Sequence, residues 1–244
     1  MNLIDDTVAC LALQRRFFGE QTVAAELLVA APDAELIFDQ IADALVETGY
    51  VVLPLALPPS IAEALFLRIA SFEDEVFQAA GVGRADEFQL NPFVRKDEIR
   101  WLSQQDPVEA SYLAWMEQLR RGLNRRLFMG LFDYEAHFSR YTEGAFYKKH
   151  VDAFKGRTNR VLSTVFYLNP GWALADGGQL LMYSDTLQPS VEPISKIAPL
   201  MGSLVVFLSD RFPHEVTAAS RLRYSIAGWF RVNATLGAHI DPPR

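Results

Sequence analysis

The sequence predicts an α+β fold in which N-terminal helices buttress a double-stranded β-helix, or jelly roll. Two observations predict it. Before Gly130, apolar residues recur at helical spacing behind capping residues. After Gly130, short segments rich in aromatic and β-branched residues alternate with turn signals such as Asn169-Pro170-Gly171 and Asp176-Gly177-Gly178. Many short strands of this kind are typical of two packed sheets, and the helices would cover one of them.

Three helices are expected in the first half of the chain. The first begins after the capping residue Asp33 and ends before Gly49, with Leu36 or Ile37, Ile41 and Leu45 facing inward. The second follows Pro58 and Pro59, where Ser60 and Glu63 have capping-box spacing, and it buries Ile61, Leu65 and Ile69. The third runs from near Pro107 to Phe128. A buried strand over 50–55 is expected between the first two.

The second half is expected to hold eight strands, which we place at 134–142, 145–151, 160–168, 179–183, 194–199, 203–208, 214–218 and 223–232. We find no internal repeat and no low-complexity linker. The domain prediction is therefore an N-terminal extension over 1–30, one jelly-roll domain with helical support over 31–235 and a tail over 236–244. The catalytic core would cover about 131–235.

Composition limits the classes of partner. The chain has 23 Lys and Arg against 30 Asp and Glu, a net charge of −7, which makes nucleic acid an unfavourable main partner. One basic cluster, Arg120, Arg121, Arg125 and Arg126, is read as the solvated face of a helix. A single cysteine, no basic leader and no long apolar run favour a cytoplasmic protein outside the membrane.

Three side chains form a candidate metal site. His150 and Asp152 are two residues apart, so on a strand they would point to the same side. His214, at the start of a later strand, would supply a third ligand from the facing sheet. Two imidazoles and one carboxylate on one side of an ion leave positions open for a cosubstrate and dioxygen, as non-heme Fe(II) requires. Zinc is the rival metal, and ordinary strand histidines are the alternative. His137 and His239 lack an acidic neighbour at this spacing and are taken as structural or surface residues.

Arg223 strengthens the case for an oxygenase. It lies nine residues after His214, in an aromatic strand where a buried guanidinium needs an anionic partner. Its planar fork suits a carboxylate held bidentately, so a dicarboxylate could bind the metal at one end and Arg223 at the other. A structural salt bridge or an exposed arginine is the alternative.

This pattern resembles the Fe(II)- and 2-oxoglutarate-dependent prolyl hydroxylases, in the branch of the animal oxygen-sensing enzymes and their bacterial relatives, from about Phe93 to Arg231. The resemblance implies that His150, Asp152 and His214 bind Fe(II) and that Arg223 binds the far carboxylate of 2-oxoglutarate. Dioxygen would be the second cosubstrate, and ascorbate is an added candidate.

The same resemblance implies roles for further residues. Tyr167, Tyr141 and Leu180 would contact 2-oxoglutarate. On the substrate side, the segment 94–101 is similar to the family's substrate-loop motif, with Lys96 in place of the usual glycine. Within this segment Arg95 would face the peptide, and Asp97 would pair with the distant Arg160. Tyr147 and Trp229 would lie near the substrate and the iron.

The functional expectation is a prolyl 4-hydroxylase acting on a protein, with elongation factor Tu as the candidate that the bacterial relatives suggest. Two alternatives stay open. One is a 2-oxoglutarate oxygenase acting on a ribosomal protein or a small molecule. The other is a non-catalytic jelly-roll module that uses its metal for sensing or structure. The sequence gives no oligomeric state.

Overall fold

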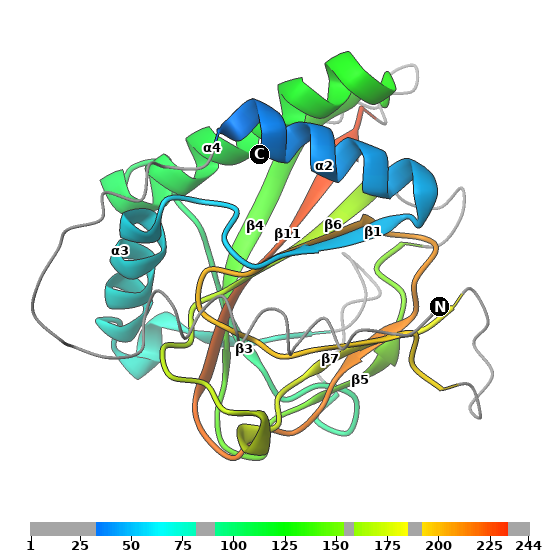
Figure 1. The fold of residues 1–244 in the computed structure, drawn as a ribbon. Coiled ribbons are helices and arrows are strands. Elements are labelled where there is room, and N and C mark those ends of the chain that lie inside the picture. Colours follow the sequence, from blue (N-terminus) through cyan, green and yellow to red (C-terminus); the bar gives the residue numbers. More distant parts are fainter. Residues whose placement is uncertain (1–32, 82–90, 154–158, 185–191, 234–244) are drawn as a thin grey trace, which may run out of the picture.

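The computed structural model describes residues 33–81, 91–153, 159–184 and 192–233. Two antiparallel sheets face each other, and three helices cover the outer side of the larger one (Figure 1). This arrangement confirms the predicted jelly roll with helical support. The predicted segments 1–30 and 236–244 and His239 lie outside the described residues. None of the helices in the described ranges has the length and apolar character needed to cross a membrane.

The larger sheet has seven strands in the order β1-β9-β6-β11-β4-β3-β2. Its centre is β11, which pairs along most of its length with β4 and β6. The strand bounds are β1 Tyr50–Leu53, β2 Gln78–Ala79, β3 Glu98–Trp101, β4 Leu131–Tyr141, β6 Arg160–Tyr167, β9 Leu204–Leu208 and β11 Arg223–Val232. The sequence analysis missed β2 and β3.

The smaller sheet has four short strands in the order β5-β10-β7-β8. Their bounds are β5 Tyr147–His150, β7 Leu180–Met182, β8 Ser195–Ile197 and β10 His214–Val216. The stretch from Val94 to Trp101 connects the two sheets at one edge. Its first part bonds to the smaller sheet, where Lys148 N donates to Val94 O and Lys96 N to Phe146 O, and its last part is β3 of the larger sheet.

The helices are α2 Ala34–Glu47, α3 Pro59–Ala70 and α4 Pro107–Leu127. Asp33 caps α2 as predicted, with its carboxylate accepting from Glu35 N. The capping box predicted for α3 is wrong: the N-cap is Pro58, which has no side-chain oxygen, and Pro59 already begins the helix. Residues Ile37, Ile41, Leu45, Leu65 and Ile69 are buried as expected, whereas Leu36 is exposed and Ile61 only half-buried.

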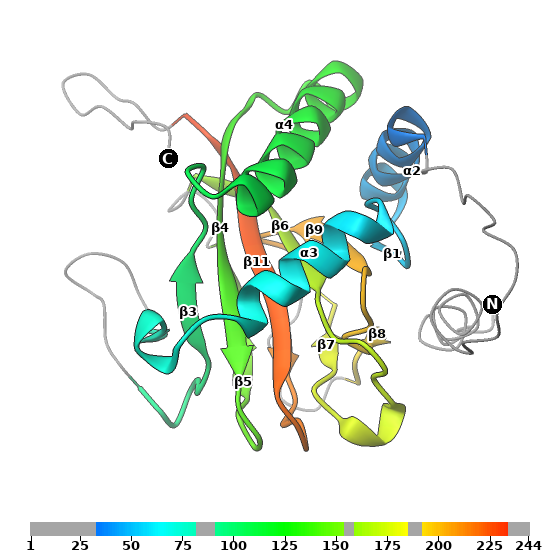
Figure 2. The ribbon, with the colours of Figure 1, turned by 90° about the vertical axis from the view of Figure 1, so that its left-hand side faces the viewer.

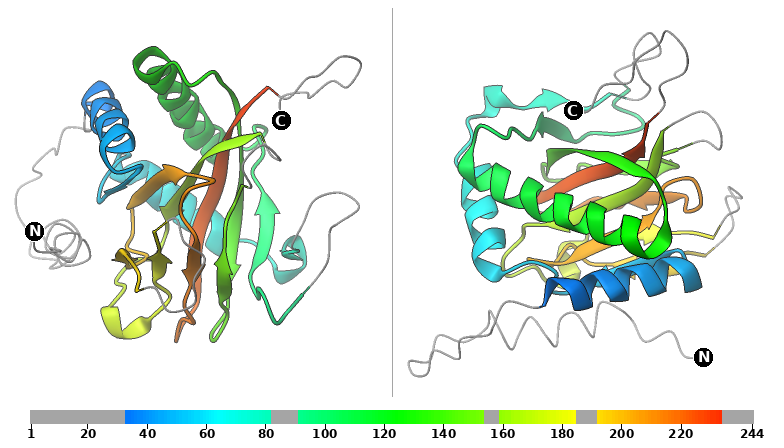
Figure 3. Two further views of the ribbon diagram at one scale, coloured as in Figure 1. Left: turned by 90° about the vertical axis from the view of Figure 1, so that its right-hand side faces the viewer. Right: turned by 90° about the horizontal axis from the view of Figure 1, so that it is seen from above.

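The helical layer is held by apolar packing and by ion pairs. α3 and α4 lie across the larger sheet, and α2 runs beside α4 (Figures 2 and 3). Arg125 and Arg126 on α4 contact Glu35 of α2, while Arg120 and Arg121 contact Glu117 of their own helix. The cluster predicted as a solvated helix face is therefore largely paired with acids, and half of it ties α4 to α2.

The two faces of the larger sheet differ in polarity. On β11, Ile226 and Phe230 point toward the helices and join the main core. The alternate residues Arg223, Ser225, Trp229 and Arg231 are also buried but point toward the smaller sheet or along the same inner face. This inner face is where the candidate site residues gather.

Candidate metal centre and cosubstrate pocket

The structure brings His150, Asp152 and His214 together, with one ligand atom from each within 4.8 Å of the others. One carboxylate oxygen of Asp152 lies 3.5 Å from His150 Nε2 and 3.8 Å from His214 Nε2. The elements differ from expectation in two ways. His214 stands directly opposite His150 in the same smaller sheet, not on the facing sheet, and Asp152 lies two residues beyond the end of β5.

Backbone contacts orient both imidazoles. His150 Nδ1 is 2.9 Å from Lys148 O, and His214 Nδ1 is 2.9 Å from Phe212 O. Because a carbonyl oxygen can only accept, each Nδ1 carries the proton, which leaves each Nε2 with a free lone pair. This tautomer is the one that a histidine metal ligand needs, and the fixed outer hydrogen bond also holds the ring in place.

The carboxylate of Asp152 is kept ionised. Burial alone would raise its pKa, but the neighbouring His214 and His150 imidazoles and the Ser163 hydroxyl hold the pKa well below its usual range. Ser163 Oγ donates to Asp152 Oδ2 at 2.5 Å, and Ser209 Oγ lies 2.9 Å from Ser163 Oγ. Burial, with the nearby His150, lowers the pKa of His214 to about 4. The carboxylate of Asp152 is therefore anionic and the imidazole of His214 neutral at neutral pH.

This donor set fits Fe(II). Two imidazole nitrogens and one carboxylate oxygen reach the same point from one side, which leaves further coordination positions for small ligands. Zinc accepts the same atoms, so the geometry of these three residues does not by itself choose between the metals.

Arg223 lies on the inner face of the larger sheet and is 1% exposed. Its Nε donates to Gly178 O at 2.9 Å and its Nη1 to Ser225 Oγ at 3.3 Å. None of the ion pairs formed among the described residues includes Arg223. Since a buried guanidinium without an anion is costly, Arg223 presents a positive charge that a carboxylate ligand would neutralise.

Two of the tyrosines predicted to contact the cosubstrate lie beside Arg223. The guanidinium carbon lies 4.7 Å from the ring centre of Tyr141 and 5.2 Å from that of Tyr167, and Leu180 is buried in the same apolar cluster. Gly178 brings its backbone against the arginine; a Cβ there would lie 3.1 Å from Arg223 Cδ, at a φ of +62°. Burial raises the pKa of the Tyr141 hydroxyl well above its usual value, so that the group remains a neutral donor.

The expected pairing of Asp97 with Arg160 is wrong. Asp97 pairs with Arg95 through two hydrogen bonds of 2.7 and 2.6 Å, because Arg95 is two residues away and on the same side of the segment. Arg160 instead pairs with Glu135 on β4, at 2.8 Å. Its guanidinium also lies 3.5 Å above the ring centre of Trp229.

The remaining predicted residues lie beside the metal centre. Arg95 covers the ring of Tyr147, which stacks on His150 with 3.6 Å between ring centres. Trp229 stands directly opposite Ser163, the residue that bonds Asp152. Its indole Nε1 is buried and makes no hydrogen bond with any of the described residues.

The sequence analysis missed Ser163, Ser209 and Glu135. The signal for Ser163 was available, because it lies four residues before Tyr167 on one strand and therefore on the same face. Ser209 and Glu135 carried no comparable signal, since their importance comes from contacts between distant strands.

Comparisons with known proteins agree with this geometry. Residues 136–231 match the family described as the 2OG-Fe(II) oxygenase superfamily. The crystal structure of a Pseudomonas putida prolyl-4-hydroxylase is 37% identical, with a TM-score of 0.71, and the match covers 81% of this chain and all of that one. A Trichoplax adhaerens prolyl hydroxylase, solved with a hypoxia inducible factor peptide, is 26% identical with a TM-score of 0.67 over 81% of this chain and 90% of that one.

Matches to curated sequences are shorter. A hypoxia-inducible factor prolyl hydroxylase of Caenorhabditis elegans is 40% identical over 89 residues, which is 36% of this chain and 12% of the relative. Human Egl nine homolog 1 is 29% identical over 147 residues, 56% of this chain and 33% of the relative. The matched part of this chain thus spans a third or less of these two relatives. The Pseudomonas enzyme, which is 37% identical and matched over its whole length, and the family match together show that the chain belongs to the 2OG-Fe(II) oxygenase superfamily.

Proposed function

We propose that this chain is an Fe(II)- and 2-oxoglutarate-dependent prolyl 4-hydroxylase that acts on a protein substrate. The single observation that carries the proposal is the pairing of a two-histidine, one-carboxylate cluster with a buried arginine that has no acidic partner in the described structure. A metal used only for structure or sensing would not need this arginine, which argues against the alternative of a non-catalytic module.

In this proposal His150, Asp152 and His214 bind Fe(II). Arg223 holds the far carboxylate of 2-oxoglutarate, with Tyr141, Tyr167 and Leu180 forming the walls. When bound, Fe(II) and 2-oxoglutarate supply the oxidation: dioxygen gives one oxygen atom to a C–H bond of the substrate and the other to succinate, with loss of carbon dioxide. The part of this chain is to hold the donors, to fix the imidazole tautomers and to keep the pocket dry.

The substrate side would be formed by Arg95, Asp97, Tyr147, Arg160 and Trp229. Two of them support this role by position: Tyr147 stacks on His150, and Trp229 lies opposite the serine that bonds Asp152. Arg95 and Arg160 are already paired with Asp97 and Glu135, so we assign them to shaping the entrance. We further propose one domain over 31–235 with its catalytic core at about 131–235.

Prolyl hydroxylation is favoured over other reactions because two solved structures that each match 81% of this chain are named prolyl hydroxylases. Elongation factor Tu is our candidate substrate, and ascorbate a candidate reductant. The competing activity is hydroxylation of a ribosomal protein or a small molecule, and proline-containing proteins and small molecules can be compared in one assay.

The test has two steps. Adding Fe(II) and 2-oxoglutarate together without oxygen should give a visible absorption band that neither gives alone. Under air, purified elongation factor Tu should gain the mass of one oxygen on a proline. Succinate formation that survives His150→Ala and Asp152→Ala would overturn the catalytic assignment. Succinate formation without a mass gain on elongation factor Tu would leave the oxygenase and exclude that substrate.

A further inference from the structure

Tyr183 follows β7 in the smaller sheet and contacts residues next to both histidines of the metal centre. Its side chain is buried. We propose that Tyr183 is a positioning residue of the metal centre, which fixes the spacing of His150 and His214 without touching the metal. The inference rests on the proposed function, because it concerns the Fe(II) site, and it adds a residue that lies outside the ligand set.

The spacing of the two imidazoles depends on how β5 and β10 lie against each other. Each Nδ1 is bonded to a carbonyl oxygen two residues earlier in its own segment, so each ring moves with its backbone. The ring centres of His150 and His214 are 4.3 Å apart. β5 and β10 have only four and three residues, and their register shifts between His214 and Val216. Few backbone contacts therefore set this spacing, and side-chain contacts between the strands add to them.

Tyr183 bonds to the chain on both sides of His214. Its N–H donates to Pro213 O at 2.9 Å, and its hydroxyl donates to Glu215 Oε1 at 2.5 Å. A hydrogen bond to a carboxylate is shorter and stronger than one between neutral groups. Since Glu215 alternates with His214 along β10, its side chain leaves the sheet on the face away from the metal ligands. Tyr183 therefore fixes His214 through both of its neighbours, from outside the metal centre.

The ring of Tyr183 also contacts the strand of the other histidine. Lys149 Nζ lies 3.3 Å from the centre of this ring, and Lys149 directly precedes His150. An ammonium group over the face of an aromatic ring is attracted by the negative charge of that face. β10 lies between β5 and β7 in the sheet, so this contact connects strands that do not pair with each other. One side chain thus holds the neighbours of both histidines.

Loss of these contacts should change the spacing of the metal ligands and not their chemistry. The three ligands remain, and the hydrogen bonds of Arg223 do not involve Tyr183. We therefore expect weaker metal binding, with normal binding of 2-oxoglutarate once the metal is saturating. A residue that only stabilised the fold would lower the free energy of unfolding and leave the metal affinity of the folded protein unchanged.

The experiment measures the Kd of the full chain for Fe(II) without oxygen, by competition with a coloured chelator. Tyr183→Phe removes only the hydroxyl and should weaken Fe(II) binding about tenfold, because the loss of a contact that orients a metal ligand has effects of this size. Lys149→Met removes the charge and keeps much of the side chain, and should weaken binding about threefold. The KM for 2-oxoglutarate at saturating Fe(II) should be the same in all these proteins.

A third variant tests whether the hydroxyl of Tyr183 acts through Glu215. Glu215→Gln keeps an oxygen acceptor, so it should weaken Fe(II) binding less than Tyr183→Phe does. The double variant should bind Fe(II) no more weakly than Tyr183→Phe alone, because both changes affect the same hydrogen bond. Urea unfolding of each protein without metal shows that it is folded under the conditions of the titration.

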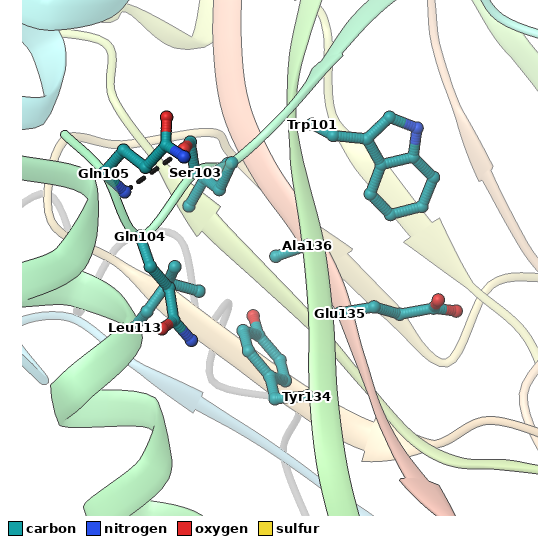
Figure 4. A pocket seen from close by; sticks show the side chains of 9 residues that line it. Trp101, Ser103, Gln104, Gln105, Leu113, Tyr134, Glu135 and Ala136 are labelled. Atoms are coloured by element: carbon teal, nitrogen blue, oxygen red, sulfur yellow. Dashed lines mark hydrogen bonds between the residues drawn. The ribbon is translucent and has the colours of Figure 1, made fainter. Parts of the chain in front are cut away.

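Two controls change residues outside the smaller sheet. Tyr224→Phe removes the same hydroxyl from a tyrosine of β11 that packs against the core beneath the helices. Gln104→Ala shortens an exposed side chain at a pocket of about 340 Å³ that is lined by residues of β3, β4, α4 and the segment 102–105 (Figure 4). Both variants should bind Fe(II) with the affinity of wild type.

Several results would overturn the inference. If Tyr183→Phe binds Fe(II) as tightly as wild type, whether or not it unfolds more readily, Tyr183 serves only the fold. If Tyr224→Phe weakens binding equally, the effect does not come from the contacts of Tyr183. Should Tyr183→Phe not fold, wild-type affinity in both Lys149→Met and Glu215→Gln overturns the inference in its place.

The behaviour of wild type separates this inference from the proposed function. If wild type binds Fe(II) and forms succinate from 2-oxoglutarate under air, the proposed oxygenase stands whatever the variants do. If wild type binds no Fe(II), the proposed function fails and the role of Tyr183 fails with it.

Discussion

Two arginines of β11, Arg223 and Arg231, show how one strand serves two purposes. Both point to the inner face of the larger sheet and both are buried, at 1% and 3% exposure. Arg231 is met by the carboxylate of Asp133 through two hydrogen bonds, whereas Arg223 has only a carbonyl and a hydroxyl as acceptors among the described residues. Where the fold supplies the acid, the arginine is structural; where it does not, the arginine is available to a ligand.

The surroundings of the two arginines agree with this division. Near Arg223 the smaller sheet closes over the larger one with an apolar cluster that includes Tyr141, Tyr167 and Leu180. Near Arg231 the inner face carries a second acid and base, Glu135 and Arg160. The metal centre lies between, since Ser163, which bonds Asp152, is on β6 beside the middle of β11.

The largest expected effect is on folding, and it concerns Arg231, the arginine that is paired with Asp133. Arg231→Gln leaves the carboxylate of Asp133 buried without its cation and should lower the free energy of unfolding by about 3–5 kcal/mol. Urea unfolding measures this loss. The double variant Arg231→Gln with Asp133→Asn should regain most of the stability, because neither charge then remains. Equal instability of the single and double variants would show that the pair itself contributes little.

For Arg223, in contrast, we expect the main effect on the affinity for 2-oxoglutarate and not on folding. Arg223→Gln should weaken 2-oxoglutarate binding roughly 100- to 1000-fold, because the ligand's far carboxylate loses a charged, two-pronged donor. Without 2-oxoglutarate its stability should equal or exceed that of wild type, since no acid is left unpaired. Titration of the anaerobic absorption band gives the Kd. Arg223→Lys keeps the charge but not the planar guanidinium, so its Kd for 2-oxoglutarate should lie between those of wild type and Arg223→Gln.

The opposite outcome would erase the difference between the two arginines. If Arg223→Gln unfolds as readily as Arg231→Gln while binding 2-oxoglutarate normally, Arg223 is a structural residue and the cosubstrate must be held elsewhere.

How far the sequence predicted these features depends on how local each one is. The eight strands of the second half were recognised because their β-branched and aromatic runs are bounded by glycine and proline turns. The strand β3 was missed because Glu98–Trp101 is short and charged and lies next to the two-residue edge strand β2. The capping box of α3 failed because Pro59 satisfies the helix start without a side-chain cap.

The site shows the same limit. The cluster of His150, Asp152 and His214 and the buried Arg223 were predictable because their residue types are rarely buried without a reason. Their partners were not, because a partner is chosen by distance across strands. Arg160 was assigned to Asp97, but Glu135 on β4 is closer to it and Arg95 satisfies Asp97 locally. His214 was expected on the facing sheet, but it shares a sheet with His150.

A smaller effect is expected from His137, which lies on the inner face beside Trp101 and Trp229. Burial and the nearby Arg95 lower the pKa of His137 to about 4. Between pH 6.5 and 4 the His137 imidazole is therefore protonated in the unfolded chain but remains neutral in the folded one. The free energy of unfolding consequently falls as the pH falls through this range. At the low end the loss should reach about 3 kcal/mol.

His137→Gln isolates this contribution, because all other titrating groups are the same in the two proteins. The difference in unfolding free energy between wild type and variant should be constant above pH 7 and should shift in favour of the variant between pH 6.5 and 4. Parallel pH curves for the two proteins would mean that His137 titrates normally, and that the paired end of the inner face is open to water.

The smallest expected effect is at Ser163, between the two ends. Ser163→Ala removes the hydroxyl that donates to Asp152 Oδ2 and should weaken Fe(II) binding about 10- to 100-fold, because the carboxylate loses the contact that fixes its rotation. Ser163→Thr keeps the hydroxyl and suits a strand, so it should restore most of the affinity. The Ser209 hydroxyl contacts Ser163 but not Asp152, so Ser209→Ala should lower the affinity for Fe(II) less than Ser163→Ala does. The Kd for 2-oxoglutarate, measured with saturating metal, should stay within about twofold of wild type, because the contacts of Arg223 do not involve Ser163. A loss of 2-oxoglutarate affinity as large as the loss of metal affinity would mean that the arginine and the metal centre act as one unit, and the division of β11 into a ligand end and a structural end would have to be redrawn.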